Sequence, residues 1–230
     1  MMRVIEINGS VEIYLEKDTI GYLVHGRKDP KESPWMPDQH ANCVLSTGQP
    51  VGFANRDGPA CGGSSGSSWN LVGFNRGKVL GYDLMCQHAP LWVKFEEAKE
   101  ANYYSMILFI EGVDREIIAN FDDFWLSKIL PLGQTFDPFH LIGRNCSSFA
   151  YESFKTVGLL SKPVPALITT PLELLKHLNS ELKARNYKLT CFSGIVGFEP
   201  VEKNRSIRTA EKNSQYVIVV EKYKNLNKDI

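Results

Sequence analysis

The segment Arg144–Phe149, which reads Arg-Asn-Cys-Ser-Ser-Phe, places a cysteine where a loop gives way to a helix. Prolines and a glycine between 131 and 138 disfavour helix ahead of it. Apolar residues then follow at near-helical spacing, namely Phe149, Phe154, Val157 and Leu160. A helix is therefore predicted to begin near Cys146. Unpaired N–H groups and the helix dipole favour a thiolate there, which makes Cys146 a candidate nucleophile.

The other cysteines do not suggest a scaffold. The chain has 5 cysteines, widely spaced and without a Cys-x-x-Cys pair, which argues against a disulfide framework or a zinc ribbon. We therefore expect no metal and no cofactor. The alternative for Cys146 is an inert buried thiol, because free cysteine is among the most buried residue types.

Composition narrows the class of protein. Lys plus Arg and Asp plus Glu are 26 each, so the formal charge is zero and the usual electrostatic footprint of nucleic-acid binding is missing. A hydrophobic content of 43% is typical of a globular protein. With 230 residues, we expect one catalytic domain, 1–230, with a C-terminal strand extension at 187–230.

The chain shows neither a secretory signal at its start nor an apolar run of the roughly 20 residues that a membrane span needs. We expect synthesis in the cytoplasm without a signal peptide, no membrane span, and export by a route other than general secretion.

The hydrophobic pattern predicts an α+β protein with an antiparallel sheet packed with helices. The predicted strands are 4–15, as a hairpin around Asn8-Gly9, then 20–24, 39–45, 50–53, 79–85, 187–198 and 215–223. The predicted helices are 95–110, 117–129 and 171–184, besides the one that begins near Cys146. Thr170 and Glu173 form a capping-box pattern at the start of the last helix.

His40 opens the predicted strand 39–45. Alternation along a strand puts His40, Asn42 and Val44 on one face, and Ala41, Cys43 and Leu45 on the other. A histidine at the start of a strand can stand at the edge of a cleft as an acid–base residue. The alternative is a surface histidine at a loop-to-strand junction.

Three other features carry little chemistry. Cys86 and His88 lack the further ligands that a metal site needs. The adjacent acids Asp122 and Asp123 point in different directions on a helix and are best interpreted as a solvated face. The Gly/Ser segment 62–68 lacks the lysine of a phosphate-binding loop and is interpreted as a surface loop.

A histidine on a strand followed by a cysteine at a helix start reverses the order of ordinary papain-like enzymes. This order resembles the circularly permuted papain-like enzymes of the NlpC-like superfamily, which includes lecithin:retinol acyltransferase-like proteins and PPPDE peptidases. The matching segments are Asp38–Leu45, Pro50–Phe53 and Leu141–Phe149. The resemblance covers about residues 35 to 180 and implies a circularly permuted papain-like (NlpC-like) fold.

The resemblance implies that Cys146 is the nucleophile and His40 the general base. It also implies that the backbone N–H of Cys146 would donate a hydrogen bond to the oxyanion. Such enzymes orient the histidine with a polar residue on the next strand, and Gly52 stands at that place here. Gln49 or Asn55 could serve instead, so the third catalytic residue stays open.

Among these enzymes, the chain is similar to peptidoglycan amidase effectors that bacteria inject into rivals by type VI secretion. That similarity implies a cysteine hydrolase that cuts amide bonds in peptidoglycan stem peptides in the target-cell periplasm. It also implies a secretion-machine carrier and a cognate immunity protein as partners.

Three alternatives remain. The same residues suit a thiol acyltransferase or lipase, which would need a hydrophobic channel, or a deubiquitinase-like peptidase, which would need a cleft for an extended tail. The chain could also be a non-enzymatic interaction module, in which Cys146 and His40 are structural and lie far apart.

Overall fold

The computed structural model describes residues 2–26, 39–55, 75–129, 138–139, 144–161, 170–201 and 215–225. Its strands are β1 (Arg3–Ile7), β2 (Ser10–Tyr14), β3 (Ile20–Gly26), β4 (Gln39–Val44), β5 (Pro50–Asn55), β6 (Asn75–Leu80), β7 (Tyr104–Glu111), β8 (Pro138–Phe139), β9 (Lys188–Pro200) and β10 (Tyr216–Asn225). Its helices are α1 (Tyr82–His88), the 3-10 turn η2 (Pro90–Trp92), α2 (Phe95–Glu100), α3 (Arg115–Leu126), α4 (Cys146–Thr156) and α5 (Pro171–Ala184).

These strands form one sheet in the order β1-β2-β10-β9-β7-β3-β4-β5-β6-β8. Every pairing between them is antiparallel. The predicted α+β class with an antiparallel sheet is therefore confirmed. β9 and β10, which the sequence placed in a C-terminal extension, lie inside the sheet between β2 and β7.

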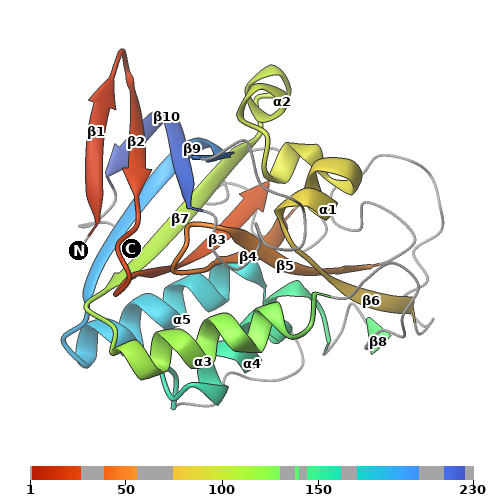
Figure 1. Cartoon of the computed structure of the whole chain (residues 1–230), viewed down its shortest axis with the longest axis vertical. Helices are drawn as coiled ribbons and strands as arrows, with labels where there is room; N and C mark the ends of the chain where they lie inside the picture. The colour runs from red at the N-terminus through yellow and green to blue at the C-terminus, as the bar shows by residue number, and fades with distance from the viewer. Residues whose placement is uncertain are drawn as a thin grey trace.

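Helices cover both faces of the sheet (Figure 1). One face packs against α3, α4 and α5, and we call it the α4 face. The other packs against α1, η2 and α2, and we call it the α1 face. Side chains alternate between the faces as the pleat requires, so Tyr22 and Cys43 join the first core while Leu23 and Val44 join the second.

Local signals located several elements correctly. Asn8 and Gly9 both have positive φ, 48° and 85°, as the predicted type I′ hairpin turn requires. Thr170 caps α5 by accepting from the Glu173 N–H, and Glu173 accepts from the Thr170 N–H in return. The predicted helix at 117–129 corresponds to α3.

Two predicted elements are wrong. The predicted helix 95–110 is the short helix α2 followed by strand β7, with Asn102 at a φ of 50° between them. β7 is buried on both faces, and a continuous apolar run does not distinguish a buried strand from a helix. The predicted strand 79–85 ends at Leu80, because α1 begins at Tyr82 after Gly81.

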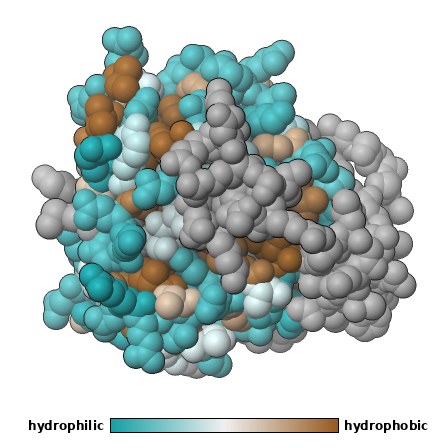
Figure 2. Space-filling model, in the orientation of Figure 1, coloured by the Kyte–Doolittle hydropathy of each residue, from teal (hydrophilic) through white to brown (hydrophobic). Residues whose placement is uncertain are grey.

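β1 is one edge of the sheet, and it exposes Val4, Ile5 and Ile7 on the hairpin seen at the upper left of Figure 2. Across the described residues, no helix has both the length and the apolar character that crossing a membrane requires.

Candidate functional site

His40 and His25 lie side by side on the α1 face. His40 is the second residue of β4, and its backbone pairs with that of His25 on β3. Both side chains are buried. They alternate with Ala41 and Val24, which pack on the α4 face. The predicted facing of His40 and Asn42 is confirmed, since both contact residues of the α1-face core.

A continuous line of hydrogen bonds links these histidines to two polar neighbours. His40 Nε2 bonds Asn42 Oδ1 at 2.9 Å, and Asn42 Nδ2 bonds His25 Nε2 at 2.9 Å. His25 Nδ1 bonds the hydroxyl of Ser105, on β7, at 2.8 Å. We call these four residues the histidine network. Each bond is buried, where a hydrogen bond that is lost is costly.

Aromatic rings enclose the network. The indole of Trp92, in η2, stacks on the His40 ring with centroids 3.7 Å apart and planes 7° from parallel. The ring of Tyr103 also stacks on the His25 ring, with centroids 5.9 Å apart. The loop that carries Trp92 therefore covers His40 with an apolar ring, which withdraws the imidazole from water.

Burial governs the charge of His25. Desolvation lowers the pKa of His25 well below its ordinary value, and positive charge on nearby His40 would lower it further. Near neutral pH, His25 is therefore an uncharged ring. A neutral ring has one nitrogen that donates and one that accepts, which suits its place between Asn42 and Ser105.

His25 makes stability depend on pH. In the unfolded chain a histidine binds a proton below about pH 6.5, whereas folded His25 stays neutral to lower pH. The unfolded state then binds more protons, so we expect stability to fall as pH drops below that value, by up to about 1.4 kcal/mol per pH unit.

Urea unfolding of wild type and His25→Gln between about pH 7.5 and 5.5 tests this, because the variant should show a shallower loss. His88→Gln is the matched control. Burial lowers the pKa of His88 too, but that side chain is far more exposed, so its removal should change the slope little. Equal slopes for wild type and His25→Gln would contradict the expectation.

The described side chain that hydrogen-bonds His40 is that of Asn42. Gln49 and Asn55 were the predicted candidates. Gln49 is buried, but its side-chain amide has no hydrogen-bond partner among the described residues. Asn55 pairs with Gly77 through the backbone, and its side chain is outside the part of the chain that the structure describes. A signal was available in the sequence, because Asn42 shares a strand face with His40.

Gly52 explains how Asn42 fits. Gly52 pairs with Asn42 across β4 and β5. A Cβ at Gly52 would collide with Asn42 Oδ1 and crowd the end of Met85. Gly52 has no side chain, and the Asn42 carboxamide therefore occupies the space that a Cβ there would take.

Cys146 is the first residue of α4, as predicted from sequence. Asn145 caps the helix by accepting from the Ser148 N–H at 2.9 Å, and the Ser148 hydroxyl accepts from the Asn145 N–H at 2.8 Å. The cap holds the helix start in one conformation. It also places Cys146 at the positive end of the helix dipole, where a thiolate is favoured.

Cys146 is buried in the α4-face core near Tyr22. The Tyr22 hydroxyl donates to the Pro171 carbonyl at 3.0 Å. Burial raises the pKa of Tyr22 well above its ordinary value, and negative charge on Cys146 and Cys43 would raise it further. Burial likewise raises the pKa of the Cys43 thiol strongly, and Cys43, unlike Cys146, lies in a strand and has no helix N-terminus to offset this.

The sheet separates Cys146 from His40. Cys146 packs in the same core as Ala41 and Cys43, on the α4 face. His40, next to Ala41 in the chain, points to the opposite face and stacks on Trp92. The described arrangement therefore does not bring Cys146 and His40, the predicted nucleophile and general base, into contact.

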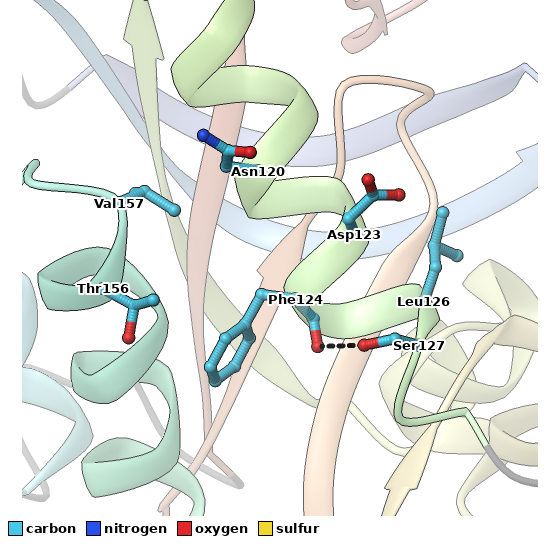
Figure 3. Close-up of a pocket in the computed structure, with 7 residues that line it drawn as sticks. All are labelled: Asn120, Asp123, Phe124, Leu126, Ser127, Thr156 and Val157. Carbon is cyan, nitrogen blue, oxygen red and sulfur yellow. Dashed lines mark hydrogen bonds between the residues drawn. The ribbon is translucent and has the colours of Figure 1, made fainter.

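A pocket of about 580 Å³ lies between α3 and the C-terminal end of α4. Figure 3 shows its lining side chains, Asn120, Asp123, Phe124, Leu126, Ser127, Thr156 and Val157. Thr156 is the last residue of α4 and Cys146 the first. At about 1.5 Å per residue, they lie about 15 Å apart along the axis, so this pocket does not serve the thiol.

Two other pairs that the sequence singled out, Asp122 with Asp123 and Cys86 with His88, lie in the described part of the chain. Asp122 is half-buried and binds the backbone N–H and hydroxyl of Ser46, so it is not the solvated acid that was predicted, whereas Asp123 is exposed. Cys86 and His88 lie on α1. Among the described residues, no cluster of three or more potential ligands could hold a metal ion.

Comparison with known proteins gives one structural similarity. No protein-family model matches this sequence, and no curated protein matches it. A crystal structure of the type VI secretion system effector TseH is similar, with a TM-score of 0.43 and 13% sequence identity. The similarity covers 75% of this chain and 98% of that chain.

Proposed function

We propose that this protein is a cysteine hydrolase that cleaves amide bonds in peptidoglycan stem peptides, with Cys146 as its nucleophile. The observation that supports this most directly is the position of Cys146 at the capped first residue of α4. Helix N-termini stabilise thiolates, and the thiolate is the nucleophilic form of cysteine.

In the proposed reaction, the Cys146 thiolate attacks the carbonyl carbon of the amide, and an electron pair moves to the carbonyl oxygen. The N–H groups at the start of α4 would donate to that oxyanion. When the C–N bond breaks, the amine leaves with a proton from the acid–base residue. Water then hydrolyses the thioester on Cys146, which releases the acid and restores the thiol.

The sequence resemblance assigns the acid–base role to His40, and this role would require His40 to reach the α4 face in the state that binds substrate. Its Nε2 is held by Asn42, while its Nδ1 is buried without a hydrogen-bond partner among the described residues. An imidazole held by a carboxamide occurs in the Cys-His-Asn sites of papain-like proteases. In the described arrangement His40 cannot take the thiol proton directly. Its role rests on this bonding pattern and is tested separately from that of Cys146.

The substrate and setting come from the sequence resemblance. A papain-like hydrolase similar to type VI effectors would act on peptidoglycan stems in the periplasm of a target cell, after delivery by the secretion machine. Its cognate immunity protein would bind the effector in the producing cell. Neither a cofactor nor a metal enters this chemistry.

Digestion of purified peptidoglycan with wild type and Cys146→Ala, followed by mass analysis of the muropeptides, tests the proposal. Wild type should release stem fragments whose masses identify the bond, and the variant should release none while keeping its circular dichroism spectrum. If wild type releases nothing, the peptidoglycan substrate is wrong. Release of fatty acid from lipid, or cleavage of a ubiquitin-like tail, would then point to the acyltransferase/lipase or deubiquitinase-like alternative.

A non-enzymatic interaction module is the second candidate. The separation of Cys146 and His40 by the sheet is the observation that favours it. In that case no acyl substrate is turned over, and Cys146→Ala behaves like wild type in every cleavage assay.

A further inference from the structure

Asn42 lies between two histidines and presents a different atom to each. Its Oδ1 faces His40 Nε2, and its Nδ2 faces His25 Nε2. The amide oxygen can only accept a hydrogen bond, and the amide nitrogen can only donate. With neutral rings, His40 must therefore carry its proton on Nε2, and His25 must accept at Nε2 and carry its proton on Nδ1.

The remaining contacts agree with these directions. The Nδ1–H of His25 can donate to the Ser105 hydroxyl, 2.8 Å away. Asn42 Nδ2 also lies 3.8 Å from Met85 Sδ, which is a weak acceptor. The reverse amide orientation would require a proton on His40 Nδ1. That atom is buried without a partner among the described residues, and a buried unpaired donor costs about 1–3 kcal/mol.

We propose that Asn42 and His25 are positioning residues that hold neutral His40 as its Nε2–H tautomer and leave Nδ1 as the proton acceptor. The catalytic meaning of this inference rests on the proposed role of His40. The tautomer itself does not depend on that role. His25 acts at one remove, because its Nε2 accepts from Asn42 Nδ2 and so holds the amide with Oδ1 toward His40, while the Ser105 hydroxyl can accept from the Nδ1–H of His25.

Gly52 is the steric condition for this arrangement. Any side chain at Gly52 would displace the Asn42 carboxamide, since a Cβ there would collide with Oδ1. Gly52→Ala therefore removes the orienting bond without deleting a polar group. Asn42→Ala removes it by deletion, so two chemically different changes should have the same consequence for His40.

Long-range proton–nitrogen NMR on protein with ¹⁵N-labelled histidine reads each tautomer directly. Wild type should show a single Nε2–H tautomer for His40 and a single Nδ1–H tautomer for His25. Gly52→Ala and Asn42→Ala should both lose the single-tautomer pattern at His40. Asn42→Asp should also lose it, because a carboxylate has no N–H to donate to His25 Nε2 and favours a protonated, charged ring beside it.

An unchanged His40 tautomer in both Gly52→Ala and Asn42→Ala overturns the inference. Ser105→Ala covers the case in which these buried variants fail to fold, because it should disturb the His25 tautomer while leaving β4 and β5 untouched. An unchanged His25 signal in that variant would also count against the proposal.

Kinetics separate this inference from the proposed function. Where wild type cleaves stem peptides, Gly52→Ala should lower kcat by about 10²-fold with KM unchanged, because acid–base catalysis contributes about 10²–10⁴-fold. Asn42→Ala should show a similar loss. A wild type that cleaves nothing but shows both predicted tautomers would refute the proposed function and leave the positioning inference standing.

Discussion

Replacing Cys146 with alanine is expected to lower the rate of stem-peptide cleavage by about 10⁴-fold or more, the scale seen when a hydrolase loses its nucleophile. The sulfur is the only side-chain atom of Cys146 that can form the acyl bond, so no neighbouring group replaces it. The measurement is the release of muropeptides over time by wild type and variant at equal concentration.

Cys86→Ala is the matched control for that measurement. Cys86 is a half-buried thiol on α1, and burial raises its pKa, so it should be a poor nucleophile. Its removal should leave the rate near that of wild type. Equal loss of activity in Cys86→Ala and Cys146→Ala would show that the assay reports general damage to the protein and not loss of the nucleophile.

The double variant that combines Cys146→Ala with His40→Ala decides whether Cys146 and His40 act in one reaction. Groups that act as a unit are strongly non-additive, so His40→Ala should cost about 10²–10⁴-fold alone and almost nothing further on Cys146→Ala. An active but less stable His40→Ala would instead make the histidine network structural. That result would leave Cys146 with a different base.

Trp125→Ala should destabilise the fold by about 3–5 kcal/mol, as expected for deleting a large core aromatic. Trp125, on α3, is fully buried and packs against Phe149 of α4, with ring centroids 5.3 Å apart. This contact belongs to the packing that positions α4, the helix that begins at Cys146. We therefore expect the variant to lose stability and activity together.

Trp125→Phe should cost much less, below about 1.5 kcal/mol, because it keeps most of the ring. The indole Nε1 has no hydrogen-bond partner among the described residues, so its removal leaves no new unpaired group. Urea unfolding of the three proteins gives both differences. The packing argument fails if Trp125→Phe is as unstable as Trp125→Ala.

Sequence patterns located the features that depend on near neighbours in the chain. The start of α4 at Cys146 and the capping box at Thr170 each use contacts within a few residues, which a sequence displays directly. The hairpin turn at Asn8-Gly9 is of the same kind. Period-two alternation also placed His40 and Asn42 on one strand face.

The same patterns failed where burial on both faces erased the periodicity. In β7 every position after Tyr104 is buried, because helices cover both sides of the sheet. A run of apolar residues then fits strand and helix equally well. The sequence also could not show that the Asn42 carboxamide fits against Gly52, since that contact depends on the register of β4 against β5.

By itself, then, the sequence determined local structure: where a helix starts, which residue caps it, and which side chains share a strand face. Only the tertiary structure decided which face of the sheet α4 would cover. That choice put Cys146 against Cys43 and Tyr22, and left His40 under Trp92 on the other side. The physical reason is that alternation fixes relative facing within a strand, whereas the face that each helix covers depends on packing between segments far apart in the chain.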